Sequence, residues 1–212
     1  MKELSYTLVC DGSSDKALLP IIDWAIGEIN PNIIPQGVYA ELGRLRHPPK
    51  NLTERIEKAN GLYPSDIIII HRDAEKEAIQ TREDEIIEAV RSLSPQPLFV
   101  AIIPVRMTEA WLFVDEMAIR KAAGNRKSRE SLPIPPLQKR EKIDAKMVLE
   151  DCLRKASGLT GRRLQKFRTR EAIQLIPGSI QDFTPLRKTP SFQHFYESLD
   201  RVLSSWNTKD ES

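Results

Sequence analysis

The stretch IIIIHRDAEKE at residues 67–77 joins four isoleucines to a dense cluster of ionisable side chains. The isoleucine run is too short for a core helix and is entirely β-branched, so it predicts a central strand that is covered on both faces. The cluster that follows contains His71, Asp73 and Glu75. In open α/β sheets, ligands bind beyond the carboxyl ends of the strands, so we expect this strand to hold its acids at a binding edge.

Segments on both sides of this strand indicate the rest of the sheet. Alternating or continuous apolar patterns predict further strands at 4–10, 33–42 and 98–103. Helical spacing predicts helices at 13–29 and at 81–93. Between them it predicts a helix of about two turns that ends at Gly61. Strands that alternate with helices predict a mostly parallel α/β sheet flanked by helices.

The second half of the chain has a different character. Residues 105–123 have helical spacing, 124–142 form a basic segment with several prolines, and 143–156 and 191–205 predict two amphipathic helices. We therefore expect an α/β domain over residues 1–123 and a basic, mainly helical extension over residues 124–212 that packs on the same domain.

Positive charge is concentrated in the middle of the chain. Residues 120–170 contain 16 Lys and Arg against 5 Asp and Glu, whereas residues 1–119 contain 12 against 19. Such a surplus attracts polyanions, and it equally fits a solvated helical face. If the partner is nucleic acid, DNA or RNA, we expect contacts to its backbone. The expected nucleic-acid surface comprises Arg126, Lys127, Arg162, Arg163 and Lys166.

Composition narrows the class of protein. The chain has 212 residues, of which 40% are hydrophobic and 29% charged, as in ordinary globular proteins. Its two cysteines, Cys10 and Cys152, match no metal-ligand spacing, so we interpret them as buried free thiols in a reducing compartment. No apolar run is long enough for a signal peptide or a membrane span. We expect a cytoplasmic protein with no membrane partner.

Three carboxylates follow predicted strands. Asp11 ends the first strand, and Asp73 and Glu75 point to the same side if the chain stays extended there. If the two strands are neighbours, the three acids meet in one crevice, where a cation would relieve their repulsion. Mg²⁺ or Mn²⁺ suits such oxygen ligands. The alternative is that all three are solvated loop acids.

Two of these segments resemble the motifs of a known domain. LVCDGSSDKALLPII at residues 8–22 is similar to the hydrophobic-Glu-Gly-x-x-Asp pattern that opens a TOPRIM domain, and IIIIHRDAEKE resembles its strand followed by Asp-x-Asp. TOPRIM domains are compact α/β folds of primases, topoisomerases, recombination proteins and overcoming-lysogenisation-defect nucleases. IPVRMTEAWLFVDEMAI (103–119) and TPSFQHFYESL (189–199) resemble segments of an uncharacterised bacterial family of TOPRIM-like domains.

The resemblance implies specific roles for the acids. Asp11 takes the place of the family's glutamate, and Asp73 and Glu75 take those of its two aspartates, which act around Mg²⁺ in phosphodiester chemistry. The exchanges at positions 11 and 75 keep the charge but move it by about one methylene. A rival alignment places His71 and Asp73, in place of Asp73 and Glu75, at the two aspartates of the family's Asp-x-Asp motif. Glu109 would be a further acid or a capping-box residue, and Asp15 is another candidate acid.

Other residues near these motifs are candidate phosphate ligands. Gly12 allows close approach of the backbone after the first strand, and Ser13 begins a predicted helix, whose N-terminus can offer N–H groups to a phosphate. Arg72 and Arg106 can hold a phosphate or form ion pairs with the acids. We interpret His71 as a locally bonded residue at the strand end in preference to a general base.

The resemblance implies a divalent-metal-dependent phosphodiesterase, a nuclease, that holds Mg²⁺ or Mn²⁺ through Asp11, Asp73 and Glu75. It also points to a phage-defence or mobile-element system, with nucleic acid and a protein encoded nearby as partners. The alternative is a catalytically inactive TOPRIM-like module with a nucleic-acid-binding or regulatory role. The exchanged acids at positions 11 and 75 favour this alternative. A phosphoryl-transfer enzyme is a third hypothesis, but the sequence lacks a phosphate-binding loop.

Overall fold

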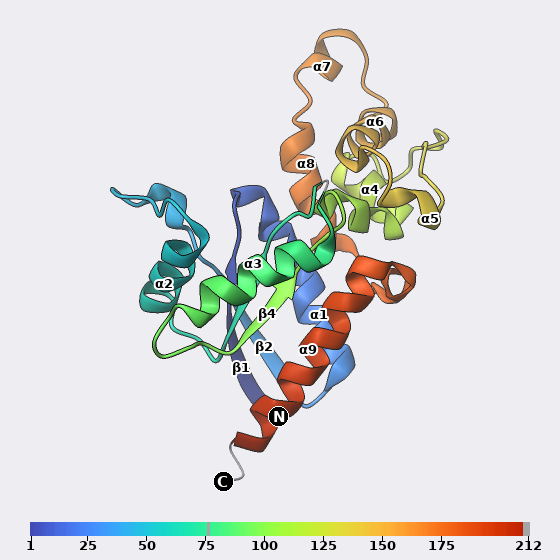
Figure 1. Ribbon diagram of the computed structural model, residues 1–212. Helices are drawn as coiled ribbons and strands as arrows, with labels where there is room; N and C mark the ends of the chain where they lie inside the picture. Colours follow the sequence, from blue (N-terminus) through green and yellow to red (C-terminus); the bar gives the residue numbers. More distant parts are fainter. Residues whose placement is uncertain (76, 210–212) are drawn as a thin grey trace.

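The computed structural model describes residues 1–75 and 77–209 (Figure 1). Its described strands form one parallel sheet in the order β2-β1-β3-β4. The strands are β1 (Lys2–Val9), β2 (Ile33–Tyr39), β3 (Ile67–His71) and β4 (Phe99–Ile102). Helices α1 (Leu19–Ile29), α2 (Leu52–Leu62) and α3 (Ile79–Arg91) lie in the three crossovers. The predicted parallel α/β sheet flanked by helices is confirmed.

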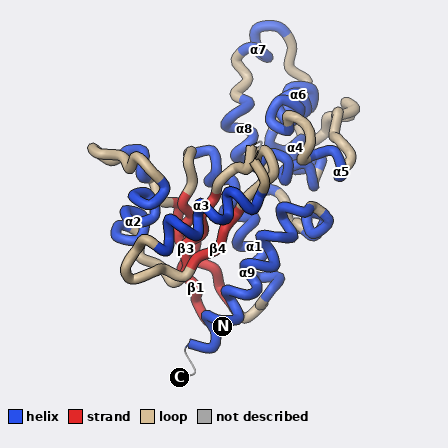
Figure 2. Tube along the Cα trace, in the orientation of Figure 1, coloured by secondary structure: helices blue, strands red, loops and turns tan. Residues whose placement is uncertain are grey.

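Each face of the sheet is covered by its own set of helices. Leu8, Ile69 and Ile102 belong to an apolar cluster that includes residues of α1 and of the C-terminal helix α9 (Pro190–Lys209). Their neighbours Val9 and Ile70 belong to a second cluster with residues of α2 and α3. Figure 2 shows the strands lying between these helices. The isoleucine run is therefore buried on both faces, as its composition predicts.

Three predicted helices differ in detail from the structure. The segment 13–29 begins with a 3₁₀ helix, η1 (Ser13–Leu18), before α1. The segment 105–123 is divided into a 3₁₀ helix, η3 (Thr108–Val114), and α4 (Glu116–Ala122). It divides at Asp115, whose carboxylate accepts hydrogen bonds from two N–H groups in the first turn of α4 and thereby starts a new helix. Gly61 lies inside α2, which continues to Leu62.

The C-terminal half adds further helices and packs on the same core. Leu149, Ile173 and Phe195 of this half share one apolar cluster with the sheet residue Leu8. Short α7 (Gly161–Gln165) lies in a loop that projects from the rest of the protein (Figure 1). No described helix is both long and apolar enough to cross a membrane. The remaining elements are η2 (Leu42–Arg44), α5 (Leu137–Arg140), α6 (Ala145–Ser157), α7 (Gly161–Gln165), α8 (Thr169–Leu175), η4 (Pro177–Ser179) and η5 (Thr184–Lys188).

Candidate functional site

The register between β1 and β3 decides where the residues at the strand ends lie. Leu8 pairs with Ile69, and Val9 pairs with Ile70. Since side chains alternate between the two faces of a strand, Cys10 continues the face of Leu8, whereas Asp11 continues that of Val9. His71 likewise continues the face of Ile69. Cys10 and His71 are thus placed on the α1 and α9 side of the sheet.

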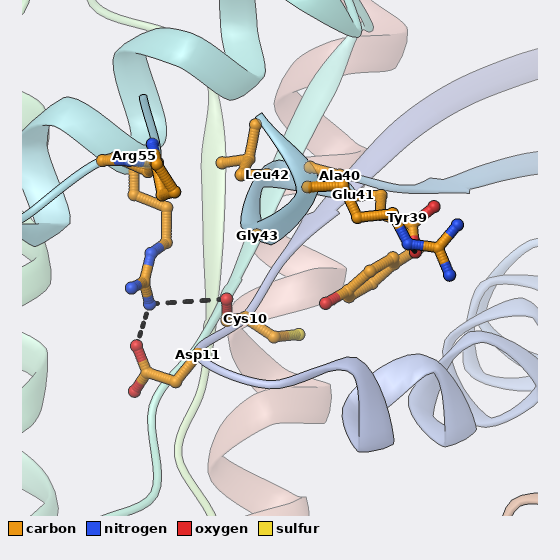
Figure 3. Close-up of a pocket in the computed structure, with 11 residues that line it drawn as sticks. Cys10, Asp11, Tyr39, Ala40, Glu41, Leu42, Gly43 and Arg55 are labelled. Carbon is orange, nitrogen blue, oxygen red and sulfur yellow. Dashed lines mark hydrogen bonds and ion pairs between the residues drawn. The ribbon is translucent and has the colours of Figure 1, made fainter. Parts of the chain in front are cut away.

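Asp11 forms ion pairs on the opposite side of the sheet, where α2 and α3 lie. Its carboxylate forms ion pairs with Arg55 of α2 and with Arg72, whose Nη1 lies 2.9 Å from Asp11 Oδ2. Figure 3 shows the Asp11 carboxylate directed towards Arg55, while the Cys10 side chain points away from it. Arg72 also pairs with Glu85 of α3 at 3.1 Å.

Asp11 and the other predicted metal ligands line different pockets. Asp11 lines a pocket of about 310 Å³ with Cys10, Tyr39 and Arg55. Asp73 and Glu75 line a separate pocket. The structure therefore places Asp11 apart from the other two, contrary to the expectation that all three carboxylates meet in one crevice.

The second pocket, which we call the acidic pocket, has a volume of about 380 Å³. Its carboxylates come from three parts of the chain: η1, the loop after β3, and η3. Two cationic side chains complete its polar lining. Of the predicted acids, four are present and Asp11 is missing, and the lining adds Lys146, which the sequence did not single out. The lining residues are Ser14, Asp15, Asp73, Glu75, Arg106, Met107, Glu109 and Lys146.

The loop after β3 has an unusual backbone. Glu75 has a φ of 55°, and it is the one non-glycine residue with positive φ that the described chain contains. This left-handed conformation costs roughly 1–2 kcal/mol for a residue with a Cβ, and such outliers concentrate at functional sites. The N–H of Ala74 donates to the Pro104 carbonyl at 2.9 Å. That bond ties the loop after β3 to the loop after β4.

His71 is buried between two carboxylates of the acidic pocket. Its Nδ1 lies 3.4 Å from Asp15 Oδ2, and its Nε2 lies 3.3 Å from Asp73 Oδ1 and 3.0 Å from Thr108 Oγ1. Burial alone would lower the pKa of His71, but Asp15, Asp73 and Cys10 together raise this pKa well above 6.5. The sequence predicted a locally bonded histidine at the strand end, and His71 is the last residue of β3.

Burial lowers the pKa of a histidine but raises that of a carboxyl group, and both effects operate in this pocket. It would raise the pKa of Asp15, but His71 and the Gly12 N–H outweigh burial and lower this pKa. For Glu109, burial raises the pKa, and the charges of Asp73 and Asp15 add to the effect against the opposing Lys146. A carboxyl group with a raised pKa can exchange a proton closer to neutral pH. Glu109 is the candidate proton carrier of this pocket.

Cys10, Asp15 and His71 form a cluster that could hold a metal ion. One ligand atom from each residue, including the thiol sulfur and an imidazole nitrogen, lies within 4.8 Å of the others. Among the described residues this is the one group of three such side chains that meets that distance. Burial raises the pKa of the Cys10 thiol to about 11, although the nearby His71 opposes the shift. Sequence reasoning missed Cys10, and the available signal was that Cys10 and His71 both end predicted strands.

Of the predicted phosphate ligands, some are engaged in contacts within the protein and one lines the acidic pocket. The N–H of Gly12 donates to Asp15 Oδ2 at 3.3 Å, and Arg72 is engaged in ion pairs. Arg106 does line the acidic pocket, and its Nη1 donates to the Lys142 carbonyl at 3.1 Å. The side chain of Ser13 lies outside what the structure describes.

The predicted nucleic-acid surface is exposed. Arg126 and Lys127 follow α4, and Arg162 and Arg163 lie in α7 with Lys166 directly after it. All five side chains are exposed. The α7 group sits on the loop that projects from the rest of the protein (Figure 1).

Comparisons of the chain with family models, with curated proteins and with solved structures find no match. Function is therefore argued from the chemistry of the site.

Proposed function

We propose that this protein is a TOPRIM-like, divalent-metal-dependent phosphodiesterase that acts on nucleic acid with Mg²⁺ or Mn²⁺. The observation that carries the proposal is the acidic pocket, where several carboxylates and two cationic side chains surround one space. Metal-dependent phosphodiester cleavage uses this combination, because the metal needs oxygen ligands and the substrate phosphate needs positive charge.

The donor chemistry of the pocket fits a hard cation. Mg²⁺ keeps several of its waters and typically uses one or two protein carboxylates together with substrate phosphates. Asp73 and Glu75 follow the same strand and offer those carboxylates. Asp11 is left out of the ligand set because its charge is already balanced by Arg55 and Arg72. The bound ion would polarise the phosphate and lower the pKa of a water ligand.

The other pocket residues would position the substrate and move protons. Arg106 and Lys146 supply positive charge for the non-bridging phosphate oxygens. Glu109 would donate or accept a proton at the leaving or attacking oxygen, a role that its raised pKa suits. The exposed basic residues of α7 would contact the backbone of a longer nucleic acid outside the pocket.

One observation favours the alternative of an inactive binding or regulatory module. His71 lies between Asp15 and Asp73, and its raised pKa favours the cationic imidazolium. An internal cation can balance these two acids without a metal ion. The fold and the pocket could then persist in a protein that binds nucleic acid but does not cleave it.

The test is a cleavage assay with single-stranded and double-stranded DNA and RNA, in Mg²⁺, Mn²⁺ or EDTA. We expect metal-dependent cleavage that Glu75→Gln and Asp73→Asn each reduce by about 100-fold or more. Asp11→Asn is the matched control, since it also removes one acid near a strand end but leaves the acidic pocket intact. Salt-sensitive binding without cleavage in any metal would support the alternative. If the protein neither binds nor cleaves any of these nucleic acids, both the phosphodiesterase and the binding-module hypotheses are refuted.

A further inference from the structure

We infer that Cys10, Asp15 and His71 form a second metal site, suited to Zn²⁺ or Co²⁺ and distinct from the Asp73 and Glu75 carboxylates proposed to hold Mg²⁺. The three residues come from separate places: the end of β1, η1 and the end of β3. The site does not rest on the proposed phosphodiesterase activity, because a cation can bind here whether or not the protein cleaves a substrate.

Spacing supports the site. His71 Nδ1 and Asp15 Oδ2 are 3.4 Å apart. In a tetrahedral zinc site, N and O ligands lie ~2.0–2.1 Å from the ion and therefore roughly 3.4 Å from each other. The Cys10 sulfur completes a group whose ligand atoms all lie within 4.8 Å. Small side-chain adjustments would bring the sulfur to the ~2.3 Å of a zinc–thiolate bond.

The orientation of His71 is that of a metal ligand. Its side chain is only 2% exposed, and Nδ1 faces Asp15 Oδ2 at 3.4 Å without the geometry of a hydrogen bond. The other ring nitrogen, Nε2, faces Asp73 Oδ1 at 3.3 Å and Thr108 Oγ1 at 3.0 Å. A metal-bound histidine commonly donates its second N–H to a carboxylate, which fixes the ring orientation. Asp73 occupies that supporting place here.

The types of ligand identify the class of cation. One thiolate, one imidazole and one carboxylate suit a borderline ion such as Zn²⁺ or Co²⁺, whereas Mg²⁺ prefers oxygen ligands alone. Three protein ligands leave the fourth tetrahedral position for water or a substrate atom. Asp15 also lines the acidic pocket, so the second site is adjacent to it. Cys10 lines the other pocket, the one that contains Asp11.

Cobalt titration tests the inference directly. Co²⁺ added to the EDTA-treated and desalted protein should produce a thiolate-to-cobalt charge-transfer band that corresponds to one bound ion; Co²⁺ on the Asp73 and Glu75 carboxylates would give no such band. Cys10→Ser should abolish the band. Cys152→Ser is the matched control, because Cys152 is the other buried free thiol and lies in α6, outside the cluster. Asp73→Asn should keep the band but weaken Co²⁺ binding by about 10–100-fold.

A second measurement uses the unaltered protein and does not depend on any variant folding. X-ray absorption of the zinc-loaded chain should show one sulfur at ~2.3 Å together with lighter ligands at ~2.0–2.1 Å. A shell without sulfur, a cobalt band that persists in Cys10→Ser, or the absence of Co²⁺ binding would overturn the site. Glu75→Gln should reduce cleavage by about 100-fold or more and leave the band unchanged, so failure of the cleavage assay and failure of this site are separate results.

Discussion

His71 Nδ1 and Asp15 Oδ2 lie 3.4 Å apart, although 55 residues of chain separate the two side chains. The contact joins the end of the central strand β3 to the 3₁₀ helix η1 that follows β1. It provides a negative charge for a histidine that is buried in the core. Stability and metal binding should therefore both depend on this pair.

The stability of the metal-free protein should depend on the charge of His71. The folded-state pKa of His71 is raised well above 6.5, so the folded state holds the proton more tightly than the unfolded state. The resulting stabilisation is fully present below pH ~6.5 and is lost as the pH rises through the folded pKa. Urea unfolding in EDTA should show the wild-type advantage over His71→Gln shrinking above pH ~6.5. An advantage that grows with pH in this window would contradict the prediction.

Asp11→Asn should have a small effect on stability and leave cleavage intact. The Asp11 side chain is 49% exposed and its partner Arg72 is 22% exposed, so solvent screens their attraction. Exposed ion pairs typically contribute less than about 1 kcal/mol. Denaturant unfolding should therefore show a loss of at most about 1 kcal/mol. A loss of cleavage as large as that in Glu75→Gln would contradict the prediction and show that Asp11 takes part in catalysis.

Gly37→Ala should destabilise the sheet. Gly37 in β2 pairs with Tyr6 in β1, and a Cβ at position 37 would collide with the Tyr6 ring. That ring is buried and fixed by the hydrogen bond from its hydroxyl to Asp23 Oδ1 at 2.7 Å. The expected cost is about 1–3 kcal/mol in the free energy of unfolding.

Gly27→Ala is the matched control for that substitution. Gly27 lies in α1, and a Cβ there meets nothing within 4 Å. Replacing a helical glycine by alanine should stabilise the protein by up to about 1 kcal/mol. Thermal unfolding of both variants should therefore give shifts of opposite sign. Equal shifts would show that the Tyr6 contact does not decide the effect.

The basic residues of α7 should contribute to nucleic-acid affinity through phosphate contacts. Arg162→Ala combined with Arg163→Ala should weaken duplex binding for all sequences alike and reduce the log–log salt slope by about 2. Lys58→Ala with Arg91→Ala removes the same charge from exposed positions on α2 and α3 and serves as the control. Fluorescence anisotropy at several salt concentrations measures the slope. Equal losses in the two double variants would indicate only a general charge effect.

Local patterns predicted the sheet but not its irregular helices. The β-branched run at 67–70 could only be buried on both faces, and the alternation of strands and helices predicted the parallel order. The division of 105–123 into η3 and α4 was missed because the apolar spacing continues across Asp115. Short α7 and α8 were also missed, since helices of about two turns carry little periodicity.

The sequence by itself determined which residues end the strands and which of them share a face within one strand. It could not determine the register between β1 and β3, because strand pairing is formed by backbone hydrogen bonds between distant segments and depends on the whole fold. Pairing Leu8 with Ile69 puts Cys10 and His71 on one side of the sheet, and it directs Asp11 towards Arg55 on the other. A shift of one residue in the register between β1 and β3 would put Cys10 and His71 on opposite faces of the sheet. The tertiary structure alone therefore decided that the acids of the pocket are joined by Asp15, and that Cys10 and His71 meet beside them.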